Sequence, residues 1–184
     1  QGNVYICGEF RGSANFGSNT LNSLGGADIF VAKLNAAGNW LWVSQAGSST
    51  DDVAYDIAVD ASGNTYITGA YRNGAVFGST TLTATGSSTN IFVAKLDANG
   101  NWLWAIHAGM GNDNDEGRSL TLDGSGNAIV TGCFRGSANF GSLAITSNGE
   151  DDIFVAKTSS GGNWLWAKQA GGVEQDRVYG VTLD

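Results

Sequence analysis

The side chains that most often carry out chemistry are sparse in this chain of 184 residues. It has one histidine, His107, and two cysteines, Cys7 and Cys133. No Gly-x-Ser-x-Gly nucleophile motif and no Ser/His/Asp constellation accompanies the histidine. One histidine and two distant cysteines also give no zinc or iron ligand set. We therefore expect a protein that is not an enzyme, in which His107 is a polar strand residue equivalent to Gln45 and Gln169.

Carboxylates are the second candidate group, and they divide into two kinds. The segment 111–116 offers Asp113, Asp115 and Glu116 as hard oxygen ligands at close spacing, as calcium prefers. It lacks the glycine and the distal glutamate of an EF-hand loop, so a solvated acidic loop is the competing interpretation. Calcium is the one cofactor that we consider. Aspartates of the other kind recur at equivalent positions and are expected to cap turns by accepting backbone N–H bonds: Asp52, Asp115, Asp176, Asp60, Asp123 and Asp184.

The composition excludes several classes of partner. Nine Lys and Arg residues against 17 Asp and Glu give a formal net charge of −8, and the basic residues are scattered. A phosphate-binding surface needs clustered cations, so nucleic acid is not expected. No apolar run is long enough to span a membrane. With 28 glycines and no proline, the chain must turn often and use Gly, Asn, Asp and Ser to do so.

An internal repeat dominates the sequence and dictates its architecture. The segment FRGSANFGS occurs twice without change, and YRNGAVFGS is its middle copy. The hexapeptide DIFVAK or NIFVAK and the tetrapeptide NWLW each occur three times, 62 residues apart. We therefore expect a single array over residues 1–184, with repeats of approximately 1–60, 61–123 and 124–184. The repeated hexapeptides begin at Asp28, Asn90 and Asp152, and the tetrapeptides begin at Asn39, Asn101 and Asn163.

Each copy has an apolar period of two, which predicts strands and no helix. The connections Asp60–Asn64 and Asp97–Asn101 are typical of tight turns. A short extra strand is expected near Leu82. The fold class predicted is all-β, with three four-stranded antiparallel repeats that form β-propeller blades; a β-trefoil is the competing fold. The strands expected in the middle copy are Val53–Val59, Thr65–Tyr71, Ile91–Leu96 and Trp102–Ala108.

Paired tryptophans are the largest apolar residues that recur in register. The members of each pair lie two residues apart, which predicts that they share one face of a strand. Because they recur as core residues do, we expect them to pack between blades rather than to form a carbohydrate-stacking surface. The irregular loop tips are better places for ligand specificity. The six tryptophans are Trp40, Trp42, Trp102, Trp104, Trp164 and Trp166.

The pattern of Asp51–Gly69, Asp-Asp-x4-Ile-x2-Asp-x2-Gly-Asn-x-Tyr-Ile-Thr-Gly, resembles the SBBP-type beta-propeller repeats of secreted and surface bacterial proteins. The resemblance extends through the following FG, DIFVAKLD and GNWLWA elements and covers the chain three times. It implies a propeller fold and an extracellular or cell-surface location. Two departures are modest: Arg118 replaces a strand tyrosine, and the turn at Thr158–Asn163 lacks the aspartate found at Asp97.

The element order predicts how the array is completed. The chain opens on the second strand of a blade, near Val4–Phe10, and closes on a first strand, near Val178–Asp184. Three blades are fewer than the roughly four to eight of closed propellers. We expect the last strand to complete the first blade of another copy, as a six-bladed dimer, a fibre or a tube. The chain would alternatively be an excerpt of a larger surface propeller.

Two classes of function remain open from the sequence. The first is a self-assembling structural or interaction scaffold, whose partner is a second copy of the chain in a head-to-tail oligomer. The second is a multivalent, lectin-like propeller that binds glycans with one site per blade. The two cysteines are expected to be separate thiols, and a disulfide across a subunit junction is the alternative.

Overall fold

The structure, a computed structural model, describes residues 2–84, 87–109 and 113–184. Every regular element in these residues is a β-strand. The strands are β1 (Val4–Phe16), β2 (Asn19–Leu34), β3 (Trp40–Ala46), β4 (Val53–Val59), β5 (Thr65–Tyr71), β6 (Ala75–Phe77), β7 (Thr80–Leu82), β8 (Asn90–Leu96), β9 (Trp102–Ala108), β10 (Glu116–Leu122), β11 (Ala128–Phe134), β12 (Ser137–Phe140), β13 (Leu143–Thr146), β14 (Asp152–Thr158) and β15 (Trp164–Ala170).

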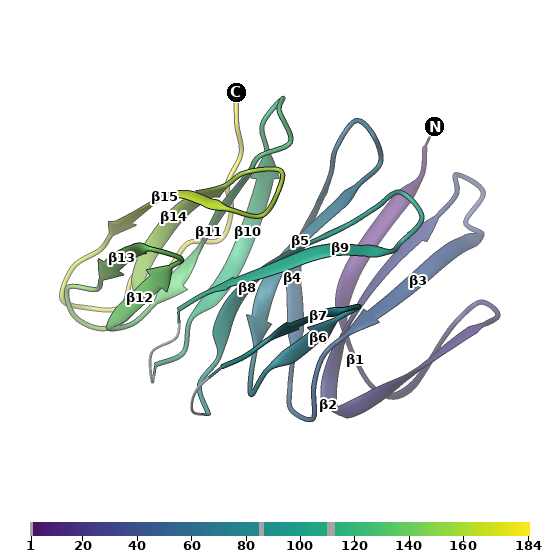
Figure 1. Ribbon diagram of the computed structural model, residues 1–184, viewed down its shortest axis with the longest axis horizontal. Helices are drawn as coiled ribbons and strands as arrows, with labels where there is room; N and C mark the ends of the chain where they lie inside the picture. The colour runs from purple at the N-terminus through teal and green to yellow at the C-terminus, as the bar shows by residue number, and fades with distance from the viewer. Residues whose placement is uncertain (1, 85–86, 110–112) are drawn as a thin grey trace.

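The strands form three antiparallel blades that follow one another along a row (Figure 1). Blade 1 is the three-stranded sheet β1-β2-β3, blade 2 is β4-β5-β8-β9 and blade 3 is β10-β11-β14-β15. Blades 2 and 3 each carry a small outer hairpin, β6-β7 or β12-β13, and in blade 1 the far halves of β1 and β2 form its counterpart. The predicted all-β propeller blades are confirmed. The middle copy differs from its expected strands only in starting β8 at Asn90 and in pairing β7 with a further short strand, β6.

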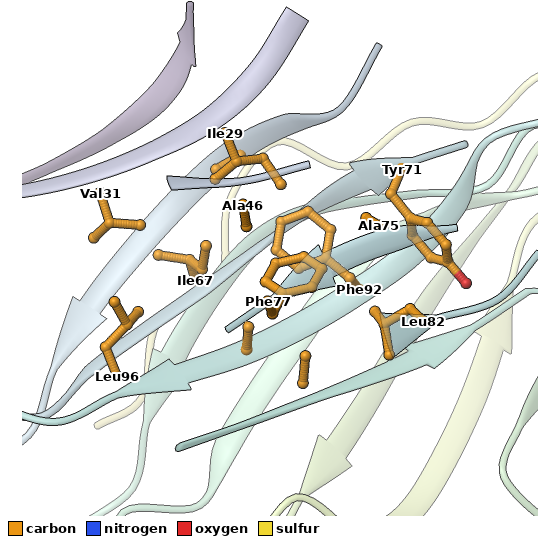
Figure 2. Packing of buried hydrophobic residues seen from close by; sticks show 13 residues of the cluster. Ile29, Val31, Ala46, Ile67, Tyr71, Ala75, Phe77, Leu82, Phe92 and Leu96 are labelled. Atoms are coloured by element: carbon orange, nitrogen blue, oxygen red, sulfur yellow. The ribbon is translucent and has the colours of Figure 1, made fainter. Parts of the chain in front are cut away.

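The hydrophobic core lies between the blades rather than within any one of them. One cluster joins Ile29 and Val31 of blade 1 to Ile67, Phe92 and Leu96 of blade 2, all of them fully buried (Figure 2). A second cluster joins Tyr66 and Val93, on the opposite face of blade 2, to residues of blade 3 that include Phe134 and Phe154. Each blade is a single sheet with two apolar faces, so it is buried only where a neighbouring sheet covers it.

Burial along equivalent strands shows which faces are covered. Every residue of β8, in the middle blade, is buried, whereas burial in β14 of blade 3 alternates with period two. The half-buried positions of β14 include Ile153 and Val155, whose counterparts Ile91 and Val93 are fully buried. We call the face of a blade that points to the next blade in the chain its forward face and the other its backward face. The forward face of blade 3 is therefore open.

The C-terminal segment takes no part in a sheet of its own chain. Residues 171–184 form no strand, and Val181 contacts blade 3 through a hydrogen bond from its N–H to Ser119 Oγ at 3.3 Å. The two termini lie at opposite ends of the row (Figure 1). The strand predicted near Val178–Asp184 is thus not formed within the single chain, because the edge of β1 that it would complete lies at the far end.

A glycine in the second strand of blades 2 and 3 lies beneath a phenylalanine ring. A Cβ atom added to Gly69 would lie 1.9 Å from the Val53 carbonyl oxygen and 2.8 Å from the ring of Phe92. Gly132 makes the same approaches to Glu116 and Phe154. Only hydrogen fits at these positions, because both neighbours belong to the packed sheet.

We predict that Gly69→Ala lowers the free energy of unfolding by about 3 kcal/mol, since backbone and ring must both shift. Gly124→Ala is the matched control, because a Cβ at that exposed turn meets no atom within 4 Å; it should change stability by less than about 0.5 kcal/mol. Urea unfolding of both variants measures the difference, and equal effects would contradict the packing described.

Candidate functional site

A bulge in the last strand of every blade directs its two tryptophans to opposite faces. In blade 1, Lys33 pairs with Trp42 whereas Leu34 pairs with Trp40, so Leu41 is an extra residue in β3. The same shift occurs in β9 and β15. An inserted residue breaks the alternation of side chains. The expectation that both tryptophans share a face is therefore corrected, and the three bulged residues are about half exposed: Leu41, Leu103 and Leu165.

The second tryptophan of each pair reaches forward to the next blade. Trp42 Nε1 donates a hydrogen bond of 3.1 Å to the Ala98 carbonyl oxygen, in the β8–β9 turn of blade 2. Lys33 Nζ donates to the same oxygen at 3.3 Å, and Ser44 Oγ donates to the Gly100 carbonyl at 2.6 Å. At the next junction, Trp104 Nε1 and Lys95 Nζ both donate to the Ser160 carbonyl. The two junctions therefore use the same forward contacts.

The first tryptophan of each pair reaches backward. Trp102 Nε1 donates to the Gln45 carbonyl oxygen of blade 1 at 3.1 Å, and Trp164 Nε1 donates to the His107 carbonyl of blade 2 at 3.0 Å. Each ring also lies edge-on to a phenylalanine of its own outer hairpin, with centroids 5.1 Å apart for Trp102 and Phe77. Indole N–H groups that are partly buried need acceptors, and the neighbouring blade supplies them.

The inner strands are joined by polar contacts that run from blade to blade. Asp56 Oδ2 in β4 accepts hydrogen bonds from Ser119 Oγ at 2.7 Å and from the Leu120 N–H at 2.8 Å, both in β10. Ser119 Oγ in turn accepts from the Val181 N–H. Since Asp56, Ser119 and Gly180 are equivalent positions of the repeat, this line of contacts also continues in one direction through the array.

At each end of the array, the indole N–H that points away from the neighbouring blade has no hydrogen-bond acceptor among the described residues. The indole N–H of Trp166, on the forward face of blade 3, has no protein acceptor there, and the side chain is 37% exposed. The indole N–H of Trp40, on the backward face of blade 1, also lacks an acceptor within residues 2–84, 87–109 and 113–184. These open faces are the candidate functional site, because each carries half of a contact that the internal junctions complete.

Repeated aspartates hold the tight turns. Asp60 accepts hydrogen bonds from the N–H groups of Ser62 and Asn64 and from Asn64 Nδ2, all within 2.9 Å. Asp123 does the same for its own turn and also pairs with Lys157 at 2.8 Å. These contacts favour the ionised form and hold the pKa of Asp123 well below its usual range. Asp97 caps the β8–β9 turn in the same way, which fixes the carbonyl that receives Trp42.

A second set of repeated aspartates follows the last strand of each blade, and of these Asp52 and Asp115 are buried whereas Asp176 is half-buried. Asp52 Oδ1 accepts from the Arg72 N–H at 3.0 Å, Asp115 Oδ1 accepts from the Arg135 N–H at 3.1 Å, and Asp176 Oδ2 accepts from the Gly172 N–H at 2.7 Å. Burial is the main cause that raises the pKa of Asp52 to about 6 and that of Asp115 to about 7. Nearby carboxylates, Asp113 and Asp151 among them, add to the rise at Asp115.

The three residues considered for calcium have separate surroundings. Asp115 is buried and bound to the Arg135 N–H, Glu116 pairs with Arg118, and Asp113 lies beside Gly136. Within the described part of the chain, no three or more His, Cys, Asp or Glu side chains are placed to hold a metal ion. The segment 110–112, which includes part of the predicted cluster, lies outside the described residues. Calcium at this loop therefore stays a prediction without support from the geometry.

The two cysteines and the histidine also have defined places. Cys7 is half-buried in β1 and Cys133 is buried in β11, and both are free thiols in this chain. Burial raises the pKa of Cys7 to about 12, so it is not a reactive thiolate. His107 in β9 contacts Tyr71, with 2.9 Å between Nδ1 and the phenol oxygen, and burial lowers its pKa. A disulfide across a subunit junction stays a prediction.

Part of this stack of repeated sheets is similar to a known family of repeats. The family model described as SBBP, a beta-propeller repeat, matches residues 41–70. This segment is thus similar to a beta-propeller repeat of the SBBP type. The matched unit runs from β3 of blade 1 through β4 and β5 of blade 2, so this SBBP unit spans a blade junction and includes the forward tryptophan Trp42. The resemblance stated from the sequence is confirmed.

Two curated proteins are similar over most of this chain. One is an uncharacterized WD repeat-containing protein, L264, of Acanthamoeba polyphaga mimivirus, with 25% identity over 85% of the chain. The other is the regulatory protein FlaEY of Caulobacter vibrioides, with 23% identity over 87% of the chain. The chain spans only 13% and 17% of the lengths of these relatives. In the described residues, no helix is long and apolar enough to cross a membrane.

The buried carboxylate of Asp115 predicts a specific dependence of stability on pH. Its pKa is about 7 in the folded state and about 3.9 in an unfolded chain. A carboxyl group whose pKa is raised on folding contributes its full stabilisation below pH 4, where it is protonated. That contribution, at most on the order of 4 kcal/mol, is lost as the pH rises through 7. We predict that Asp115→Asn, which cannot ionise, loses less stability than the wild type between pH 4 and 8.

Asp123→Asn is the control for this experiment. The pKa of Asp123 is lowered by Lys157 and by the turn N–H groups, so its contribution is constant over that range and its loss should destabilise at every pH in it. Thermal melts of the three proteins at several pH values measure the slopes. Parallel slopes for the wild type and Asp115→Asn would refute the assignment.

Proposed function

We propose that the chain is a non-catalytic repeat scaffold that assembles with further copies of itself, head to tail, through its two open blade faces. The forward face of blade 3 in one copy binds the backward face of blade 1 in the next. Its setting, outside the cell or on the cell surface, stays a prediction from the resemblance to secreted repeats. The observation that carries the proposal is the pair of indole N–H groups, on Trp166 and Trp40, that lack the partner their counterparts have.

Apolar exposure on the forward face of blade 3 supports this proposal. Ile153, Val155 and Trp166 are partly exposed, whereas their counterparts on blade 2 pack against blade 3. Exposing such an apolar face to water is unfavourable, and covering it with a second sheet stabilises the assembly. The backward face of blade 1 is the natural cover, since Phe30 there is only half-buried while its counterparts Phe92 and Phe154 are fully buried.

The repeat supplies the hydrogen bonds that such a contact would make. Ala36 is equivalent to Ala98 and Ser160, so its carbonyl on a neighbouring copy would accept from Trp166 as those carbonyls accept from Trp42 and Trp104. In the same contact, the carbonyl of Gln169, equivalent to Gln45 and His107, would accept from Trp40. The interface joins two different patches, so it is heterologous and gives a ring if the rotation closes or a fibre if it does not.

The inner edge of blade 1 supports the same arrangement. β4 and β10 cover this edge in blades 2 and 3, whereas β1 pairs only with β2 among the described strands. The segment Val178–Asp184 repeats the sequence pattern of β4 and β10 and pairs with no strand. Strand addition at an open edge is a common mode of recognition. This segment of one copy would therefore complete the sheet of the next.

The lengths of the relatives indicate a second way in which the two open blade faces could be covered. Both relatives are much longer than this chain, so flanking blades of the same polypeptide would cover the same two faces. The physical contact is identical in the two cases. Self-assembly requires that residues 1–184 alone associate, and the experiment below decides this.

Size-exclusion chromatography with light scattering over a range of concentrations tests the proposal. We predict a dimer or larger species for the wild type and a shift towards monomer for Trp166→Glu. Loss of a central tryptophan typically costs about 2 kcal/mol or more, which is roughly thirtyfold in affinity. Leu103→Glu is the matched control, because Leu103 is 52% exposed on the outer edge of the middle blade, away from both faces.

Two results would overturn the proposal. A wild-type protein that is folded and monomeric at every concentration would show that residues 1–184 do not assemble alone. A loss of assembly in Leu103→Glu equal to that in Trp166→Glu would show that the association is not through the open face. Circular dichroism of each variant establishes that its blades remain folded.

A further inference from the structure

Three positions differ together in the middle blade and set it apart from its neighbours. In blades 1 and 3 a glutamine donates to a buried aspartate: Gln45 Nε2 to Asp28 Oδ2 at 2.7 Å, and Gln169 Nε2 to Asp152 Oδ2 at 2.8 Å. In blade 2 these positions hold His107 and Asn90. The third position, phenylalanine in the other blades, holds Tyr71.

The contacts of Tyr71 fix which nitrogen of His107 carries the proton. The Tyr71 hydroxyl donates to the Thr83 carbonyl oxygen at 3.2 Å, and its oxygen lies 2.9 Å from His107 Nδ1. A phenol has one proton, and a carbonyl can only accept, so Nδ1–H must donate to the phenol oxygen. The two rings are nearly parallel, at 9°. His107 Nε2 is then an acceptor, and it has no protein partner among the described residues.

An open cavity of about 470 Å³ lies beside this histidine, between the outer hairpin of blade 2 and blade 3. Its volume falls within the range of small-molecule sites, about 300–1,000 Å³. The lining residues that carry polar side chains are Thr80, Thr81, His107 and Asn139, and Trp164 is the largest residue of the lining. No charged side chain lines this cavity among the described residues.

At the counterpart positions in the other blades, the side-chain nitrogen donates to a buried aspartate. In blade 1, Gln45 Nε2 donates both to Asp28 and to the Asn22 carbonyl oxygen. In blade 3, Gln169 donates to Asp152. In blade 2 this glutamine is replaced by His107, which lines the cavity and whose Nε2 has no protein partner within residues 2–84, 87–109 and 113–184.

We propose that this cavity binds an uncharged sugar residue, with a sugar hydroxyl donating to His107 Nε2. A lining without charge does not match a phosphate, a carboxylate or a cation. A lining that combines hydroxyl, amide and aromatic side chains matches a molecule that is rich in hydroxyls and has an apolar face. This is a single site in the middle blade, and it does not depend on the assembly proposed above.

Nuclear magnetic resonance of the tryptophan indole N–H groups tests the proposal directly. The probes are glucose, galactose, mannose and N-acetylglucosamine, each at about 10 mM, which suits a Kd near 1 mM. We expect at least one of them to shift the Trp164 indole signal and to leave those of Trp40 and Trp102 unchanged. Assignment uses Trp164→Phe, and glucuronic acid serves as the charged comparison.

The double variant Asn90→Asp with His107→Gln provides the matched control, because it installs the pair that blades 1 and 3 already hold. It should retain the wild-type melting temperature and bind the sugar at least tenfold more weakly. Tyr71→Phe, which removes the group that fixes the proton on Nδ1, is a second variant should the first fail to fold; it too should bind more weakly.

Three outcomes would overturn the proposal. The first is the absence of any Trp164 shift with all four sugars. The second is an equal response of the Trp40, Trp102 and Trp164 signals. The third is unchanged affinity in whichever of the two variants is folded.

Discussion

The extra residue in the outermost strand of each blade is the constraint on which the array depends. A single sheet has two faces and can bury neither by itself. Without the bulge, Trp40 and Trp42 would lie on one face and would anchor the blade to one neighbour only. With Leu41 inserted, one indole reaches forward and the other backward. The repeat therefore specifies a stack of sheets rather than a set of independent ones.

The polar contacts of the junctions follow from the same arrangement. A tryptophan that reaches across needs an acceptor at a fixed place, and the capped turns supply it. Asp97 holds the turn whose Ala98 carbonyl receives both Trp42 and Lys33. The recurring aspartates thus act on the junction through the loops they shape. Their placement also explains how an acidic protein accommodates buried carboxylates: Asp52 and Asp115 fix loops at the junctions, at the cost of a raised pKa.

The sequence predicts the strands well because alternation and turn residues are local signals repeated three times. The sequence does not predict that the two tryptophans of a pair point to opposite faces. Residues two apart share a face only where the strand pairing is regular, and a bulge in that pairing depends on the partner strand. The leucine between each pair of tryptophans fits the apolar pattern of a strand, so the sequence did not mark it as the half-exposed extra residue that the structure shows. The cavity beside His107 was also missed, because the histidine was judged alone rather than together with Asn90 and Tyr71, which differ in the same blade.

Repetition also determines what the ends of the array can bind. The operation that carries blade 1 onto blade 2 also carries blade 2 onto blade 3, as the matching tryptophan contacts at the two junctions indicate. Applied once more, it places a further blade on the forward face of blade 3. The same contact is then available to a blade from the same polypeptide or from another copy, because the face recognises the repeat and not the chain. Whether such a stack closes into a ring or extends as a fibre depends on the rotation from one blade to the next.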